Sequence, residues 1–157
     1  HVFAVSPAID PESTGSTIDK NPIFRRYFMR KMRKLYRMKI ELFPHLNHMS
    51  DILNQTTTLG VTEAFISNSP EFANLKEYFD AYRINVGDFV ASPIPVTLMS
   101  SDDDPIVLSA PARALWEGPN FDKIFTQYGG HNGFFNQSLD DVLSERIAAE
   151  QFLCSLK

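Results

Sequence analysis

Two loops of this 157-residue chain carry the residue types that acid–base catalysis requires. His131 lies in the run Gly129-Gly130-His131-Asn132-Gly133-Phe134-Phe135, directly after an apolar segment. The acidic run Asp102-Asp103-Asp104 also follows an apolar segment, and Asp104 precedes His131 by 27 positions. Histidine titrates near neutral pH, and a carboxylate at one ring nitrogen fixes its tautomer and stabilises its charged form. The order acid, then histidine is that of a triad in which a serine precedes both.

Asp104 is the candidate acid of this pair, and Asp103 is the alternative. Asp104 precedes Pro105, which favours an extended backbone, and it stands three residues before Val107. An aspartate run after a strand also suits turns and helix caps, and we assign that role to Asp102. We interpret His131 as the catalytic base, because flanking glycines let its loop bend tightly.

The sequence contains no serine in the setting that a triad nucleophile requires. That setting is Gly-x-Ser-x-Gly between a strand and a helix, where a sharp turn exposes the hydroxyl. Ser16 follows Gly15 but lacks the second glycine and a preceding strand. Ser6 ends an apolar run but precedes Pro7, which would spoil the turn. We therefore expect that this chain alone hydrolyses no ester.

Three short apolar runs predict the strands that must position these loops. They are His1–Val5, Val96–Met99 and Lys123–Tyr128. Helical patterns separate them, and alternating strands and helices indicate an α/β protein with a parallel sheet. The run at the N-terminus is apolar enough to suit a strand buried on both faces. Edge strands are usually short or protected by polar residues. Since the chain also begins inside this strand and without Met, we expect an incomplete sheet from a longer polypeptide.

Residues 6–20 are rich in Ser, Thr, Pro, Gly and Asp, so we predict a loop there. Asn21 and Pro22 then suit the cap and first turn of a long helix, which Pro44 ends. Steps of three and four place one apolar stripe along it. Its members are Phe24, Phe28, Met32, Leu35, Tyr36, Ile40 and Phe43.

A broken helical pattern follows the long helix. We predict helices at about 49–55, 61–67, 71–83 and 111–116, and a last helix over 139–156 with Ser138 as its cap. The chain thus divides into a strand and loop (1–20), a helical region (21–91) and the C-terminal strands and helices with the acid and base (92–157).

Composition narrows the class of protein. A net charge of −4 does not suggest a nucleic-acid binder, and the single cysteine, Cys154, excludes an internal disulfide and suits a reducing compartment. No run approaches a membrane span, and the first residues of the sequence lack a signal peptide's order of charged, apolar and small-residue regions. We expect a cytoplasmic protein without cofactor or metal, because His1, His45, His48 and His131 show no ligand spacing.

The long helix is strongly basic, with eight cations from Arg25 to Lys39 and no acid before Glu41. A solvated charged face is one interpretation. Weak peripheral contact with an anionic membrane is the other, and it would suit an enzyme that cleaves lipid esters. A nucleic-acid partner is not expected, since no docking motif accompanies the helix.

The two loops resemble those of the α/β-hydrolase superfamily, in particular its YheT-like branch. The likeness is carried by Ser92–Met99, Asp103–Val107, Gly129–Phe134, Leu59–Phe65, Tyr78–Tyr82 and Val2–Pro7. It covers only the family's C-terminal half, so the nucleophile and the oxyanion hole would lie upstream of His1.

This resemblance implies a piece of a serine esterase that acts on small-molecule or lipid carboxylic esters. Asp104 and His131 would be its acid and base, with no cofactor. The helical stretch 23–82 would be a cap over the active site, and its apolar residues would pack internally or line an acyl pocket. A non-catalytic binding or scaffold protein on the same fold is the alternative, because a fold does not fix a function.

Overall fold

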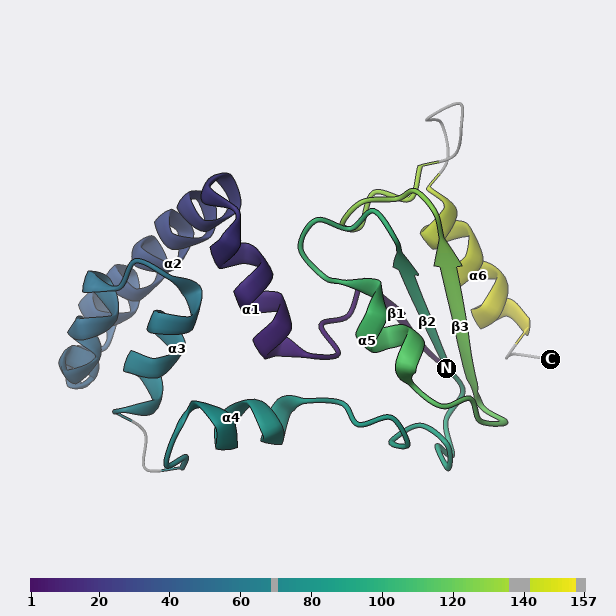
Figure 1. Cartoon of the computed structure of the whole chain (residues 1–157), viewed down its shortest axis with the longest axis horizontal. Helices are drawn as coiled ribbons and strands as arrows, with labels where there is room; N and C mark the ends of the chain where they lie inside the picture. Colours follow the sequence, from purple (N-terminus) through teal and green to yellow (C-terminus); the bar gives the residue numbers. More distant parts are fainter. Residues whose placement is uncertain (69–70, 136–141, 155–157) are drawn as a thin grey trace. The chain divides into compact units, whose positions relative to one another are not determined.

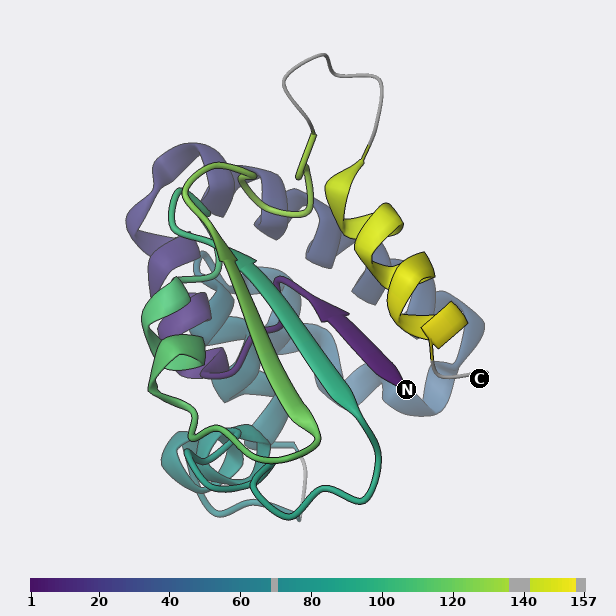
Figure 2. The ribbon, with the colours of Figure 1, turned by 90° about the vertical axis from the view of Figure 1, so that its right-hand side faces the viewer.

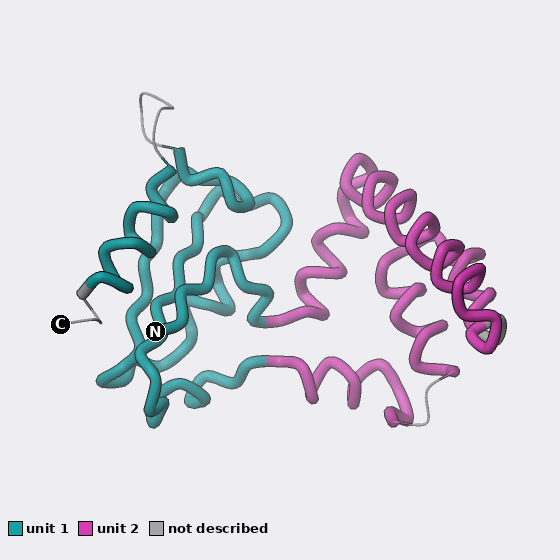
Figure 3. The backbone as a smooth tube through the Cα atoms, turned by 180° about the vertical axis from the view of Figure 1, so that it is seen from behind, with its two compact units in different colours: residues 1–9, 84–157 teal, residues 10–83 magenta. Residues whose placement is uncertain are grey.

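The computed structural model describes residues 1–68, 71–135 and 142–154. The chain forms two compact units (Figure 3). Unit 1 comprises residues 1–9 and 84–157, and unit 2 comprises residues 10–83. The helical unit therefore begins at Asp10 and ends at Arg83. The sequence suggested different bounds for the helical region, 21–91.

Unit 1 is built on a three-stranded parallel sheet with the strand order β1-β2-β3 (Figure 1). The strands are β1 (Val2–Val5), β2 (Val96–Ser101) and β3 (Phe121–Thr126). Helices α5 (Ser109–Ala114) and α6 (Leu143–Cys154) lie on opposite sides of the sheet (Figure 2). The predicted α/β class with a parallel sheet is confirmed.

The central strand β2 is buried at all six positions. Its side chains alternate between the two faces, and on one face Leu98 packs with Ala112 and Leu115 beside α5 and with Phe121 of β3. β1 lies at the edge of this sheet and is only partly buried, with Val2 47% exposed. The incomplete sheet expected from its apolar run stays a prediction.

Unit 2 consists of helices α1 (Pro11–Lys20), α2 (Pro22–Leu42), α3 (Thr58–Ile66) and α4 (Leu75–Tyr82), with a 3₁₀ segment, η1, over Pro44–Asn54. The loop predicted over 6–20 was wrong from residue 11 onward, where α1 lies. The carboxylate of Asp10 caps α1 by accepting from the backbone N–H of Ser13. The hydroxyls of Thr14 and Thr17 donate to carbonyls one turn earlier, so polar residues typical of loops are used inside the helix.

Helix α2 begins and ends as predicted. The side chain of Asn21 accepts from the N–H groups of Ile23 and Phe24, and the helix ends at Leu42, before Pro44. The predicted apolar stripe was partly wrong, because Leu35 and Phe43 are exposed and Met29 is the buried residue. The buried face is shifted around the helix toward the core of unit 2, where Met29 packs with Ile52, Val61 and Ala64.

The last helix, α6, begins at Leu143, after Val142 forms an isolated bridge with Phe135. The predicted cap Ser138 and the predicted helix start at Leu139 lie outside the described residues. Among the helices that the structure describes, none is long and apolar enough to cross a membrane.

Candidate acid–base site

The structure brings Asp104 and His131 together at the carboxyl edge of the sheet. Asp104 lies on the loop after β2, and His131 lies on the loop after β3. These strands are parallel neighbours, and their register pairs Ser101 with Thr126 at the last position of each. Both loops therefore leave the sheet at the same edge, which is where open α/β sheets carry functional residues.

The carboxylate of Asp104 is held by three hydrogen bonds. Its Oδ1 accepts from the backbone N–H groups of Ile106 at 2.8 Å and Val107 at 2.9 Å. Its Oδ2 lies 3.0 Å from Nδ1 of His131. The side chain of Asp104 has no exposed surface. Pro105 and the two N–H donors make a tight turn that presents one oxygen of the carboxylate to the histidine.

The second ring nitrogen of His131, Nε2, is available for proton transfer. Its side chain is 31% exposed, and the described residues offer no hydrogen-bond partner to Nε2. When Nδ1–H of His131 donates to the carboxylate of Asp104, this tautomer leaves the lone pair on Nε2. An imidazole in that state is able to accept a proton from a neighbouring hydroxyl, as the base of a triad does.

Two side chains fix the histidine loop through Gly130. The hydroxyl of Ser101 donates to the carbonyl of Gly130, and Asp103 Oδ1 accepts from its N–H, both at 2.8 Å. The hydrogen bond from Gly130 lowers the pKa of Asp103 below its ordinary value. Asp103, the alternative acid, thus contacts the backbone of the histidine loop, whereas Asp104 contacts the histidine ring.

The loop itself turns through left-handed backbone at three positions. Gly130, Asn132 and Phe134 have φ values of 54°, 68° and 44°. Phe134 is 1% exposed, and a Cβ on Gly129 would lie 2.7 Å from its ring. A glycine is therefore required at position 129, where the ring of Phe134 packs against the backbone and fixes the end of the loop.

Asp102 lies in the turn after β2, as the sequence suggested, but its carboxylate bonds to side chains of α5 and does not cap that helix. Its carboxylate accepts three hydrogen bonds from the guanidinium of Arg113, two of them at 2.8 Å, and one from the hydroxyl of Ser109. These bonds, chiefly those from Arg113, lower the pKa of Asp102. They tie the acidic loop to α5. The guanidinium also lies 4.1 Å from the ring centroid of Phe125.

Sequence reasoning did not identify Ser101 or Arg113 as supports of this site. Ser101 had a detectable signal, because a hydroxyl at the end of a fully buried strand requires a hydrogen-bond partner. Arg113 had none, since an arginine in a short helix is ordinarily a solvated residue.

Neither serine considered as a nucleophile exposes its hydroxyl on a turn between a strand and a helix. Ser16 is inside helix α1 of unit 2. Ser6 follows β1 at the carboxyl edge of the sheet and has a φ of 45°. However, Ser6 is only 5% exposed, and its hydroxyl is buried without a partner among the described residues.

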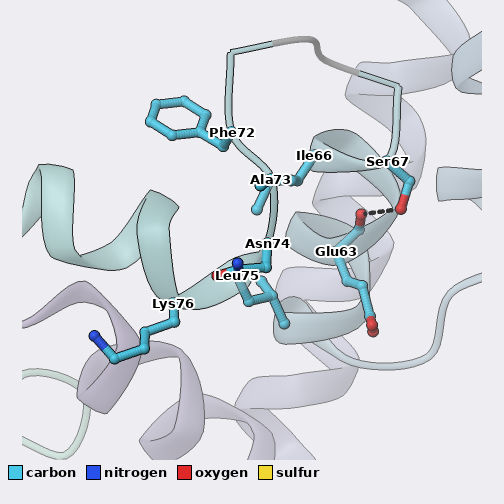
Figure 4. Close-up of a pocket in the computed structure, with 8 residues that line it drawn as sticks. All are labelled: Glu63, Ile66, Ser67, Phe72, Ala73, Asn74, Leu75 and Lys76. Atoms are coloured by element: carbon cyan, nitrogen blue, oxygen red, sulfur yellow. Dashed lines mark hydrogen bonds between the residues drawn. The ribbon is translucent and has the colours of Figure 1, made fainter.

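The described part of the chain also has a hollow of about 510 Å³ that does not involve this pair. It lies in unit 2, between the end of α3 and the start of α4 (Figure 4). Its lining residues are Glu63, Ile66, Ser67, Phe72, Ala73, Asn74, Leu75 and Lys76. Glu63 and Lys76 are both exposed, and the hollow contains no grouping of side chains typical of a catalytic site.

Known proteins do not resemble this chain closely enough to assign it. No family model, curated protein or solved structure matches it. The described residues also contain no group of three or more His, Cys, Asp or Glu side chains that could hold a metal ion. The function must therefore be argued from the geometry of Asp104 and His131.

Proposed function

We propose that this chain carries the acid and the base of a serine hydrolase that acts on carboxylic esters. One observation carries the proposal: Nδ1 of a partly exposed His131 lies 3.0 Å from a carboxylate oxygen of the fully buried Asp104. A buried carboxylate that also accepts two backbone N–H bonds is an arrangement that keeps the charge in place and orients one imidazole tautomer.

The proposed chemistry divides between the two residues. Nε2 of His131 takes the proton of a serine hydroxyl as the serine oxygen attacks the ester carbonyl, and then gives that proton to the departing alcohol. In the second half of the reaction, Nε2 takes a proton from water as the water oxygen attacks the acyl-serine, and then returns that proton to the serine oxygen as the bond to the acyl group breaks and the carboxylic acid leaves. Asp104 stays ionised throughout and stabilises the imidazolium.

In this proposal, a segment outside the 157 residues supplies the serine and the oxyanion hole. Ser6 is a poor candidate for the nucleophile, because a triad serine must expose its hydroxyl on a sharp turn. The Oγ of Ser6 is buried. Without the serine, little of the catalytic power of a triad survives, so the chain alone is expected to be inactive.

The resemblance to YheT-like α/β-hydrolases supports the same proposal. Three parallel strands in the order β1-β2-β3, with the acid after β2 and the histidine after β3, fit the C-terminal part of that fold. The helices of unit 2 would be the cap. There, Phe28, Met32 and Phe79 line a small hollow of about 210 Å³ that suits a short acyl chain.

Two experiments test this proposal. The first is the sequence of the coding region directly upstream of the codon for His1. We expect Gly-x-Ser-x-Gly within roughly one helix length, about 25 residues. A reading frame there with no such serine would contradict the proposal.

The second experiment measures p-nitrophenyl acetate hydrolysis by the 157-residue chain and its variants. We expect no turnover above that of His131→Ala. Turnover by the chain alone that disappears in His131→Ala and in Ser6→Ala would show that Ser6 is the nucleophile and that no outside segment is needed.

A further inference from the structure

Helix α2 exposes two parallel rows of side chains, which together we call the outer face of α2. The basic row consists of Arg26, Arg30, Lys34 and Arg37, and the apolar row consists of Ile23, Tyr27, Leu35, Met38 and Leu42. Steps of three and four residues keep each row on one side of the helix, with Lys31 standing between Tyr27 and Leu35 in the apolar row. Each member of the basic row directly precedes either an apolar residue or Lys31, so the rows lie side by side. Met29 lies on the buried side, away from both rows.

The basic row is without acidic partners in the part of the chain that the structure describes. None of its four cations takes part in an ion pair there, and the one acid of the helix, Glu41, lies beyond the row. Arg33 shows the contrasting case. It is half-buried and donates to the carbonyls of Leu53 and Gln55. Some cations of α2 therefore hold unit 2 together, whereas the basic row points its charge into solvent.

The apolar row is unusually exposed for a helix that already buries another face. Ile23 is 78% exposed, Tyr27 57% and Leu42 69%. Lys31 lies in line with this row, and its ammonium group is 5.5 Å from the ring centroid of Tyr27. A hollow of about 450 Å³ also opens on the first turns of the helix, lined by Pro22, Ile23, Arg26, Tyr27 and Arg30.

We propose that the outer face of α2 binds an anionic lipid surface. Cations beside an exposed apolar row are what an interfacial helix presents, because the apolar row enters the acyl boundary while the cations contact phosphate groups. The rows run from Ile23 to Leu42, a length of roughly 30 Å. A nucleic-acid duplex would match the basic row but would leave the apolar row in water.

The net charge of the whole chain implies that only a local surface can attract an anionic membrane. The net charge is −4, so an anionic membrane repels the protein as a whole. Attraction must then come from a local surface, and the basic row together with Lys31 provides it. This proposal does not depend on ester hydrolysis, since binding is measured without substrate.

Co-sedimentation of the full chain with vesicles tests the proposal. Vesicles of phosphatidylcholine with 30% phosphatidylserine are compared with vesicles of phosphatidylcholine alone, at low and at high salt. We expect binding to the anionic vesicles at low salt and a large loss at high salt. The absence of binding to anionic vesicles at low salt would overturn the proposal.

Matched variants locate the binding surface. Each cation near an anionic leaflet strengthens partitioning about fivefold, so Arg30→Gln with Lys34→Gln should weaken binding roughly 25-fold. The control, Lys20→Gln with Lys76→Gln, removes the same charge from exposed positions outside the outer face and should change binding less than about threefold. Equal losses in both pairs would overturn the assignment to α2. Far-UV circular dichroism checks folding, and the single variants replace a pair that does not fold.

The apolar row is tested by Leu35→Gln with Met38→Gln, which leaves all cations in place. We expect weaker binding that high salt abolishes completely. The same assays are run with a short DNA duplex in place of vesicles. Tight duplex binding without vesicle binding would show a nucleic-acid surface and would overturn the proposal.

Discussion

Replacing Asp104 by Asn exchanges one carboxylate oxygen for an NH₂ group and so turns a hydrogen-bond acceptor into a donor. The amide oxygen can still accept from the N–H groups of Ile106 and Val107. The amide NH₂ then lies where Oδ2 faces Nδ1 of His131, 3.0 Å away. Two donors cannot share a hydrogen bond, so the ring must carry its proton on Nε2. The lone pair of the proposed base is thereby lost.

The expected cost in stability is small for Asn and large for Ala. A charge-assisted bond becomes a neutral one in Asp104→Asn, which costs about 1 kcal/mol. Asp104→Ala leaves three donors without an acceptor, at about 1 kcal/mol or more each. For a chain of this length, 1 kcal/mol shifts the Tm by about 3 °C. We therefore expect losses of about 3 °C for Asn and about 10 °C for Ala.

Long-range ¹⁵N–¹H NMR of the histidine rings measures the tautomer, and thermal melting measures the stability. At a pH where His131 is neutral, we expect the Nδ1–H form in the unmodified chain and the Nε2–H form in Asp104→Asn. Asp103→Asn is the matched control and should leave the tautomer unchanged. An Nδ1–H form that persists in Asp104→Asn would refute the inferred hydrogen bond.

Four further outcomes follow from the contacts. Ser101→Ala should cost about 1 kcal/mol and speed amide exchange in the loop that contains Gly130, measured by NMR. The folded-state pKa of Asp103 is lowered, so the ionised carboxylate stabilises the folded chain. This stabilisation should be full above about pH 4, the ordinary carboxyl value, and should disappear as the pH falls through the lowered pKa. The difference in melting temperature between the unmodified chain and Asp103→Asn should therefore shrink at acid pH. Asn132→Ala should cost about 1 kcal/mol while Asn132→Gly is tolerated, because φ is 68°. Met29→Ala should lower the melting temperature of unit 2 by the equivalent of about 2–5 kcal/mol and leave the tautomer of His131 unchanged.

The sequence was sufficient to predict the parallel strands and the elements that carry the acid and the histidine. The apolar runs at 96–99 and 123–128 predicted β2 and β3, although β3 begins at Phe121 and ends at Thr126. The meeting of Asp104 and His131 follows from that topology, because both residues leave parallel neighbours at the same edge.

Helix α1 and the orientation of α2 were not predictable from local patterns. Composition favoured a loop over 11–20, where hydroxyls bond to backbone within the helix and Ile18 is buried. In α2, Leu35 and Met29 are equally suited to an apolar position. Which of them is buried depends on packing against Ile52 and Val61, and no periodicity encodes that choice.

The support of the histidine loop depended on tertiary contacts in the same way. Ser101, Asp103 and Gly130 are joined by hydrogen bonds between residues far apart in the sequence. Only the parallel register of β2 and β3 makes these contacts possible.

The most direct test of the central claim is ester hydrolysis by the chain joined to the polypeptide encoded immediately upstream of His1. We predict turnover of p-nitrophenyl acetate by this longer protein, with kcat falling about 10⁴-fold in Asp104→Asn and similarly far in His131→Ala, while Ser6→Ala changes it little. Turnover that is retained in His131→Ala would contradict the assignment of His131 and Asp104 as the base and acid of the hydrolase.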